Sequence, residues 1–558
     1  MPMNAVDIPA GVYRHGTDLE GTGRWRDVNL VRWRNGSLMP VGGWEERVKG
    51  GTTESFTASA DQKAFTYTFT NPDRDTQISV FKNGNLQPES AYSITLSTKS
   101  VVFIERCDAG DVVDIKLTLL DKPVRGVIAW IDNSFNTNMA VGTYAHLYYV
   151  SANNAVTDIT PTGFTTGSQD AAQRSGFGAA NFGEGYYGTP RASTGEFQEA
   201  TTWALDNWGE YLVACSVDDG KLYEWQLDNN TAAAQISNAP INNLSLVVTG
   251  ERFLFALGAG GNPRKVQWCD KENNTDWTPT ATNEAGDFEL QSNGEILSGH
   301  RLRSRTLILT TTDAHVANYI GPQLVFSFDR VGTDCGAISR HACVSHMEGA
   351  YWMGSKSFFF YNGSAVQEMP CDVLDYVFTD INNDQRSKVT AMNNAQFGEV
   401  WWFYPSGGSV ENDRYVVFNY QERYWNIGTL DRTSGFDAGV LRHPIMFDSS
   451  GKFYDHENGF DHEGNAPFAE SGPIIFGHNV FKVNEIIPDE KNQGDATLTF
   501  KTRFYPNGEE STHGPFDTAN PVTTRFSGRQ VRMRVNGTEL RNWRFGVQRL
   551  NVIPGGNR

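Results

Sequence analysis

Hydrophobic and polar residues alternate in short runs along most of the chain. Residues 65–69 read Phe-Thr-Tyr-Thr-Phe, and residues 112–117 read Val-Val-Asp-Ile-Lys-Leu. Such alternation is typical of half-buried β-strands, because successive side chains of a strand point to opposite faces. Pairs such as Asn35-Gly36 separate the runs and predict tight hairpin turns. No helical periodicity persists over a long window, so the pattern predicts an all-β protein.

A looser unit recurs from about residue 122 to residue 470. In each copy an apolar run, a polar turn and a second, aromatic run follow one another, as in residues 211–225. Further copies begin near Tyr144, Phe253, Leu307, Tyr351, Val400 and Pro444. Their spacing, about 42–54 residues in most cases, is that of four-stranded propeller blades. The repeat predicts a β-propeller of six or seven blades, and the count depends on whether N-terminal strands complete the last blade.

The predicted strands divide the chain into four parts. Residues 1–51 form an N-terminal segment that we expect to close the propeller. Residues 52–121 hold about four or five strands, enough for a small inserted β-sandwich. Residues 122–470 form the propeller, and residues 471–558 form a further β-rich segment.

Composition and charge narrow the classes of function. Hydrophobic residues make up 39% of the 558 residues and charged residues 20%, a balance typical of folded proteins. The net charge of −18 argues against a nucleic-acid grip, because clustered Lys and Arg are needed to hold phosphates. An acidic surface would still let DNA pass without sticking.

Cysteine usage and hydropathy bear on where the protein is made. The 6 cysteines are scattered without a CxxC pair, which favours assembly in a reducing cytoplasm. Residues 1–10 lack the features of a secretory signal, and no run approaches about 18 apolar residues. We therefore expect no stable membrane insertion.

Two segments resemble a known propeller turn. Ser216-x-Asp218-x-Gly220-x-x-Tyr223 resembles the Asp-box of sialidase propellers, and residues 448–451 are a weaker echo of it. In sialidases these boxes lie far from the catalytic residues, and Asp and Gly suit any tight turn between strands. We interpret both segments as turns.

Two groups of residues carry the types of side chain that bind metals. One group contains Cys335, His341, Cys343 and His346; zinc accepts these ligands, but the spacing matches no known finger. The other is an acidic loop over residues 455–463, with Asp455, His456, Glu457, Asp461, His462 and Glu463. Its spacing is not that of an EF-hand. We expect buried cysteines, partly exposed histidines and a solvated loop, and the sequence leaves open whether residues 455–463 bind an ion.

Motifs of catalysis are missing from the sequence. It contains no complete phosphate-binding loop and no nucleophile elbow of the form GxSxG in a strand-turn-helix setting. We therefore assign no catalytic, cofactor-binding or metal-binding residue, and we expect a structural protein and not an enzyme.

The C-terminal segment is basic although the whole chain is acidic. Its arginines are Arg525, Arg529, Arg532, Arg534, Arg541, Arg544 and Arg549. In a strand, Arg532 and Arg534 would share one face, and the apolar residues Val531, Met533 and Val535 would share the other. This alternation predicts a half-buried strand whose arginines meet carboxylates, in a neighbouring protein or within the fold, and not DNA.

Dispersed motifs at both ends of the chain resemble the tail nozzle (tail hub) proteins of short-tailed bacteriophages. The N-terminal motifs are Ile8-Pro9-Ala10-Gly11-Val12-Tyr13-Arg14, Gly16-Thr17-Asp18, Gly23-Arg24-Trp25, Leu30-Val31-Arg32-Trp33 and Pro40-Val41-Gly42-Gly43-Trp44. The C-terminal motifs lie in residues 503–508, 514–515, 525–529, 543–544 and 554–558. Between them, residues 333–336, 370–373 and 401–405 also resemble that family. Residues 52–121 are outside this resemblance.

Residues 52–121 have a likeness of their own. The segments 55–58, 65–69, 80–84, 92–94 and 110–113 are similar to the amino-terminal, tail-attaching domain of podovirus tail fibres. In fibres such a domain docks on the tail. The resemblance therefore implies that the insert contacts tail fibres or receptor-binding proteins.

The family resemblance implies a structural role in a virion tail. It implies a propeller-based subunit, six copies of which form a ring under the adaptor protein that joins the tail to the portal. The ring would be assembled in the host cytoplasm, and DNA would pass through its lumen without specific binding. The alternative is a propeller enzyme or lectin that acts on host cell-surface glycans, which would be expected to cluster Asp and Glu at the propeller centre.

Overall fold

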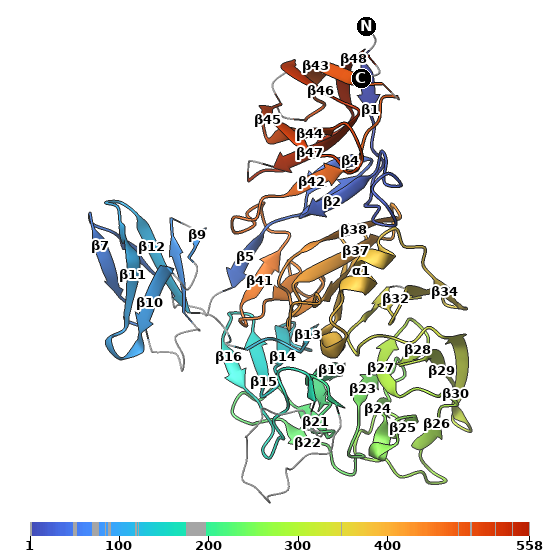
Figure 1. Ribbon diagram of the computed structural model, residues 1–558. Helices are drawn as coiled ribbons and strands as arrows, with labels where there is room; N and C mark the ends of the chain where they lie inside the picture. The colour runs from blue at the N-terminus through green and yellow to red at the C-terminus, as the bar shows by residue number, and fades with distance from the viewer. Residues whose placement is uncertain are drawn as a thin grey trace, which may run out of the picture.

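The computed structural model describes most of the chain: residues 3–47, 53–69, 78–83, 85–87, 91–117, 120, 122–173, 197–346, 349–477, 479–491, 494–518, 521–537 and 540–556. The fold is almost entirely β, as predicted, and has three parts: a propeller, an inserted sandwich and a C-terminal pair of sheets (Figure 1). Among the described residues, no helix combines the length and the hydrophobicity that a membrane crossing requires.

Seven four-stranded antiparallel sheets, counted over the described residues, form the blades of the propeller. Blades 1 and 2 are β13 (Gly126–Ile131), β14 (Thr137–Gly142), β15 (Leu147–Ser151), β16 (Val156–Asp158) and β19 (Trp203–Trp208), β20 (Tyr211–Ser216), β21 (Leu222–Trp225), β22 (Ala234–Gln235). Blades 3 and 4 are β23 (Ser245–Val248), β24 (Leu254–Leu257), β25 (Lys265–Trp268), β26 (Gly286–Glu289) and β27 (Ile296–Arg301), β28 (Thr306–Thr310), β29 (Asp313–Gly321), β30 (Val325–Thr333). Blades 5 and 6 are β31 (Cys343–His346), β32 (Gly349–Met353), β33 (Phe358–Tyr361), β34 (Val366–Glu368) and β35 (Thr390–Asn394), β36 (Glu399–Tyr404), β37 (Arg414–Asn419), β38 (Tyr424–Thr429). Blade 7 is β39 (Ser434–Phe436), β40 (Ile445–Phe447), β41 (Phe453–His456) and β5 (Trp44–Arg47).

The ring is closed by a strand from the N-terminal segment. The innermost strands β13, β19, β23, β27, β31, β35 and β39 contact one another in that order, and β39 contacts β13. The outermost strand of blade 7 is β5, which pairs with β41 so that Trp44 lies opposite His456 and Arg47 opposite Phe453. The sequence left six and seven blades open, and β5 makes the seventh blade complete.

Apolar runs form the blades because each blade is covered on both faces. Neighbouring blades share a cluster of buried apolar side chains, for example Trp203 and Trp225 between blades 1 and 2, and Phe255 and Trp268 between blades 3 and 4. A strand buried on both faces carries a continuous hydrophobic run, as Glu399–Tyr404 does. This packing explains why the sequence of the repeat is rich in Trp and Phe.

Because successive strands of a blade run in opposite directions, the propeller has two faces, which we name by the loops they carry. The connection face carries the links from one blade to the next and the turns between the second and third strands of each blade. The hairpin face carries the turns between the first and second and between the third and fourth strands. On the connection face, blades 5 and 6 are linked by α1 (Leu374–Asp380) and the 3₁₀ helix η5 (Asn383–Lys388), and the link between blades 1 and 2 contains β17 (Ala172–Gln173) and β18 (Phe197–Gln198). Another 3₁₀ helix, η4 (Ala259–Gly261), lies within blade 3.

The insert is a small β-sandwich between β5 and β13, beside the propeller in Figure 1. Its core is its own and contains Phe65, Val80, Val101, Val113 and Ile115. One sheet has the order β10 (Tyr92–Thr95), β11 (Ser100–Cys107), β7 (Gln62–Thr66). The other has the order β6 (Thr53–Thr57), β12 (Val112–Leu117), β8 (Ile78–Lys82), β9 (Asn85–Leu86), and the 3₁₀ helix η3 (Leu96–Thr98) follows β10.

The C-terminal part combines strands from both ends of the chain, and the two termini lie close together in Figure 1. One sheet has the order β1 (Asn4–Val6), β48 (Gln548–Pro554), β43 (Phe481–Ile487), β46 (Val522–Gly528). The other has the order β2 (Trp25–Asn29), β42 (Phe468–Ser471), β47 (Gln530–Gly537), β44 (Ala496–Arg503), β45 (Ser511–Asp517). Of the N-terminal segment, β5 closes the propeller, whereas β1 and β2 join these sheets, and β42 begins before residue 471.

A single hydrophobic core joins the C-terminal part to blades 5 and 6. It includes Trp33 and Trp543 as well as Phe358, Trp402 and Trp425 of the two blades. Trp33 lies in a short hairpin of β3 (Val31–Arg34) and β4 (Ser37–Pro40). The C-terminal part and the propeller are therefore packed as one body at this joint.

Candidate functional site

Both Asp-box-like segments are turns, as predicted. Residues 217–221 connect β20 to β21, and Gly220, which has a φ of 66°, donates its N–H to the Ser216 carbonyl. Asp218 accepts a hydrogen bond from the Thr201 hydroxyl, and Asp219 accepts one from the Tyr223 hydroxyl. Residues 448–451 connect β40 to β41, so both turns join the second strand of a blade to the third.

The cysteine and histidine group does not gather into a ligand set. Cys335 and Cys343 are buried, in agreement with the sequence-based expectation. Burial raises the pKa of the Cys335 thiol to about 11 and lowers the pKa of the His341 imidazole to about 4. Within the described part of the chain, no three His, Cys, Asp or Glu side chains are placed to hold a metal ion.

The acidic loop is not solvated, and that expectation was wrong. Glu457, His456 and His462 are almost fully buried. Glu457 accepts two hydrogen bonds from Arg32, at 2.6 and 2.9 Å, and Arg32 also meets Glu399 at 2.9 and 3.0 Å. The loop is buried because β3 and β5 of the N-terminal segment lie against it.

The basic C-terminal strand meets carboxylates of its own chain. Val531, Met533 and Val535 are buried on one face of β47, as the alternation predicted. On the other face, Arg532 contacts Asp18, and Arg534 contacts Glu470 at 3.3 Å. Of the two possibilities left open for this strand, the contacts within the fold are therefore present.

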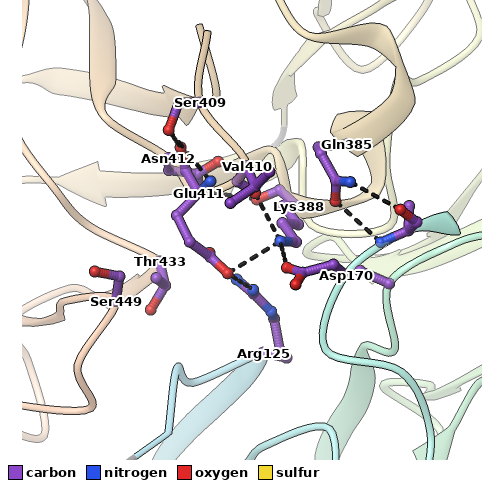
Figure 2. A network of polar contacts seen from close by, with 12 residues as sticks. Arg125, Asp170, Gln385, Lys388, Ser409, Val410, Glu411, Asn412, Thr433 and Ser449 are labelled. Atoms are coloured by element: carbon purple, nitrogen blue, oxygen red, sulfur yellow. Dashed lines mark hydrogen bonds and ion pairs between the residues drawn. The ribbon is translucent and has the colours of Figure 1, made fainter.

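A network of polar contacts surrounds the buried Lys388 on the connection face of the propeller (Figure 2). Lys388 is fully buried, and its Nζ donates to Asp170 Oδ1 at 2.5 Å, to the Val410 carbonyl at 2.6 Å and to Glu411 Oε1 at 3.0 Å. Arg125, directly before β13, donates from Nη2 to the same Glu411 oxygen at 2.5 Å. Two cations thus share one carboxylate at the mouth of the channel.

The same network ties the link between blades 1 and 2 to the opposite side of the ring. The Gln385 amide exchanges two hydrogen bonds with the backbone of Ala171, at 2.9 and 3.0 Å. The Ala200 N–H donates to the Ser387 hydroxyl at 3.2 Å, and Arg340 pairs with Glu199 at 3.1 Å. These contacts tie the described ends of this link to the segments before blades 5 and 6, and we call the whole set of contacts the seal.

Some buried polar atoms of the seal have no hydrogen-bond partner among the described residues. They are Arg125 Nε and Nη1, Arg340 Nε, Glu411 Oε2 and Asn412 Oδ1. The Arg125 guanidinium and the Glu411 carboxylate are held in ion pairs. Among the residues of Figure 2, no hydroxyl or thiol is hydrogen-bonded to a histidine.

No pattern in the sequence identified the residues of this seal. Arg125, Asp170, Lys388 and Glu411 come from four separate segments, with Lys388 at the end of η5, and Lys388 lies 218 residues from Asp170. None belongs to a short motif. A weak signal existed, because charged residues stand in links between otherwise apolar strands.

Two histidines inside the ring predict sensitivity to acid. Burial lowers the pKa of both His300 and His341 to about 4. The charge of His341 lowers the pKa of His300 further, and the charge of Arg340 lowers that of His341 further. The unfolded chain binds these protons near pH 6.5, so stability is full above that pH and falls as the pH drops toward 4. In His341→Gln we expect the free energy of unfolding to fall less on acidification than in the wild-type chain, by roughly 1–3 kcal/mol.

Denaturant titrations of the wild-type and His341→Gln chains at pH 7.5 and 4.5 measure this difference. His443, which lies in a surface link of blade 7, provides the control substitution His443→Gln. An equal loss of stability in all three chains would contradict the prediction.

A pocket of about 740 Å³ lies where the N-terminal segment meets α1 and blade 6. Arg14 and Arg414 stand over the Tyr376 ring, at 4.6 and 5.8 Å from its centre. Arg414 also pairs with Asp380 at 2.9 Å, and Arg26 pairs with Asp18 at 3.3 Å. The pocket therefore has a mixed lining in which most of the positive charge is already balanced.

The chain is similar to known proteins in structure but not in sequence. No family model and no curated protein sequence matches the chain. Virginiamycin B lyase from Staphylococcus aureus is similar in structure, at 6% identity, over 61% of this chain and 97% of that chain, with a TM-score of 0.37. PorZ, a surface component of the type-IX secretion system of Porphyromonas gingivalis, matches at 10% identity over 72% and 46%, with a TM-score of 0.35. At these values the similarities carry no argument about what this chain does.

Proposed function

We propose that this chain is a structural subunit of a short-tailed bacteriophage tail, the nozzle whose ring continues and closes the DNA-ejection channel. One observation carries the proposal: motifs from three distant parts of the sequence that resemble nozzle proteins meet at one joint. Arg24 pairs with Asp372 at 3.1 Å, the His15 ring bonds to the Cys371 carbonyl at 2.5 Å, and Asp18 pairs with Arg503. When the residues that a family shares include no catalytic group, we expect these residues to maintain the architecture.

The sealed channel supports a role without catalysis. A glycan-cleaving propeller would be expected to present free Asp and Glu at its centre. Here Glu411 and Asp170 are tied to Lys388 and Arg125. In this proposal DNA does not run through the propeller, and the lumen lies between subunits of the ring. The net charge of −18 suits a wall that DNA passes without binding.

We expect the purified full-length chain, or the virion, to show a sixfold ring with a bore that admits duplex DNA. Electron microscopy with symmetry analysis is the measurement. A ring of heterologous contacts closes at a fixed rotation, so the symmetry should be uniform from particle to particle. A monomer or trimer that releases reducing sugar from host glycans would instead establish the propeller enzyme.

Removal of the insert tests its part in the proposal. The sandwich has its own core and interrupts only the link from β5 to β13. We therefore expect a chain with residues 52–117 replaced by a short Gly/Ser linker, which keeps Leu120 in the core between blades 7 and 1, to form the same ring. Binding of tail fibres or receptor-binding proteins should be lost. Electron microscopy and a co-sedimentation assay with those partners report the two properties separately, and loss of the ring would make the insert part of the assembly core.

A further inference from the structure

The pocket of about 740 Å³ beside α1 contains a guanidinium group without an anionic partner. Arg14 lines this pocket, and no carboxylate of the described residues forms an ion pair with it. Its Nε is buried and has no hydrogen-bond partner within the described part of the chain. The charge of Arg14 rests only on the Tyr376 ring, 4.6 Å from the ring centre, whereas Arg26 and Arg414 of the same pocket are in ion pairs.

The positive charge around Arg14 is only partly neutralised. Arg26 pairs with Asp18 at 3.3 Å. The same carboxylate also contacts Arg503 and Arg532. Burial and the neighbouring guanidinium groups, that of Arg14 included, lower the pKa of Arg26 below its usual value although Asp18 opposes this. The wall of the pocket that the N-terminal segment forms is therefore positive, in a chain whose net charge is −18.

Two hydroxyl groups of α1 add unused hydrogen-bond donors to the pocket. Tyr376 accepts a hydrogen bond from Arg414 Nη1 at 2.5 Å, and no described residue accepts the proton of the Tyr376 hydroxyl. Thr379 is exposed in the pocket and makes no hydrogen bond with the described residues. The two residues are three apart on α1, so they lie on one side of the helix. A guanidinium and two hydroxyls without acceptors match the oxygens of a carboxylate.

The rest of the lining selects among anionic ligands. Asp375 and Asp380 also line the pocket, and their charges would repel the closely spaced phosphates of a nucleic acid. Two guanidinium groups already stand over the Tyr376 ring, so this ring is poorly placed to stack on a sugar. A pocket of about 740 Å³ is far larger than one carboxylate and has room for several groups of a ligand. A peptide would supply backbone N–H groups for Asp375, whose side chain is 70% exposed.

We propose that this pocket binds an acidic peptide segment of a partner protein, with a side-chain carboxylate of that segment paired to Arg14. Tyr376 and Thr379 donate to the oxygens of the peptide, and Asp375 accepts from its backbone. A planar guanidinium can hold a carboxylate through two parallel hydrogen bonds, which fixes the orientation of the segment as well as its charge. The inference goes beyond the proposed function and does not rest on it, because it uses only the charges of one chain.

Ligand-observed NMR with the full-length chain tests the site. The probe is an end-blocked peptide of three glutamates, the reference is the same peptide with three glutamines, and inorganic phosphate is the competitor. We expect saturation transfer to the glutamate peptide and little transfer to the glutamine peptide, and an equal concentration of phosphate should not displace the probe. The net charge of −18 works against non-specific binding of an acidic peptide, so binding requires a local positive site.

Substitutions on two walls of the pocket provide the second measurement. Arg14→Gln should weaken binding of the glutamate peptide about 10-fold or more, the scale of a hydrogen bond to a charged group. Arg34→Gln removes the same charge at an exposed position and is the control. Thr379→Glu leaves Arg14 in place and puts a repelling charge into the pocket, so it should abolish binding. Thr282→Glu adds the same charge in an exposed turn between β25 and β26 and should leave binding unchanged.

Each outcome decides for or against the site. Loss of binding in Arg14→Gln and Thr379→Glu, with binding kept in both controls, supports it, and Thr379→Glu decides alone if Arg14→Gln does not fold. No binding of the glutamate peptide to the wild-type chain, equal binding of the glutamine peptide, or binding that survives both pocket substitutions overturns it. Displacement by phosphate would show a site for small oxoanions and overturns the peptide. None of these results depends on a ring, so the nozzle proposal stands or fails separately by electron microscopy.

Discussion

Replacing Arg32 by methionine is expected to destabilise the chain by about 3–5 kcal/mol, because it leaves two buried carboxylates without their cation. Arg32 is 1% exposed, and its guanidinium bonds to both oxygens of Glu399 and of Glu457 and stands 3.7 Å from the Phe397 ring centre. Burial disfavours the charged form, but the two carboxylates outweigh it and raise the pKa of Arg32 above its ordinary value. The charge therefore persists at every working pH.

The free energy of unfolding, from denaturant titration at neutral pH, measures this effect. Arg34→Met is the matched control, since Arg34 ends the same strand β3 but is exposed and should change stability by no more than about 0.5 kcal/mol. The triad connects the N-terminal segment to blades 6 and 7, so Arg32→Met should also speed proteolysis around β5. Similar stability of the two variants would show that the triad contributes nothing net.

Local pattern was enough to predict the strands but not their partners. Alternation and turn residues predicted an all-β chain, the repeat predicted a propeller, and the alternation in Val531–Val535 gave the buried face of β47 correctly. Those signals act over a few residues. Arg32 and Glu457 are 425 residues apart, and nothing near Glu457 in sequence indicates that a buried arginine will meet it. Acidic residues in a loop are usually solvated, which is why the loop was misjudged.

The blade count shows the same limit. Six blades can be read from consecutive strands, but the seventh needs β5, which is separated from β39, β40 and β41 by nearly the whole propeller. Trp44 gives the physical reason for that pairing: its ring stacks on His456 at 5.1 Å and lies under Arg432 at 5.0 Å. Closure by the N-terminal strand ties the ends of the ring together. It also places the insert at the junction of blades 7 and 1.

Lys388→Met is expected to open the channel seal, with a cost of about 1–3 kcal/mol, because it removes the cation that pairs with Asp170 and one of the two cations that neutralise Glu411. The loss should be local. The link between blades 1 and 2 is held at Asp170 and Ala171 by Lys388 and Gln385, so its described ends, residues 160–173 and 197–202, should exchange amide hydrogens faster.

Hydrogen exchange followed by mass spectrometry resolves those segments, and blade cores such as β36 provide an internal reference. Lys356→Met is the control, because Lys356 is exposed on blade 5 and lies outside the network. Salt gives a further check: Lys388 itself is fully buried, so raising the ionic strength should change exchange in the link much less than the substitution does. Unchanged exchange in Lys388→Met would mean that Gln385, Ser387 and Arg340 hold the link without the buried charge. The link would then be held by these contacts alone, and Lys388 would only balance the charges of Glu411 and Asp170.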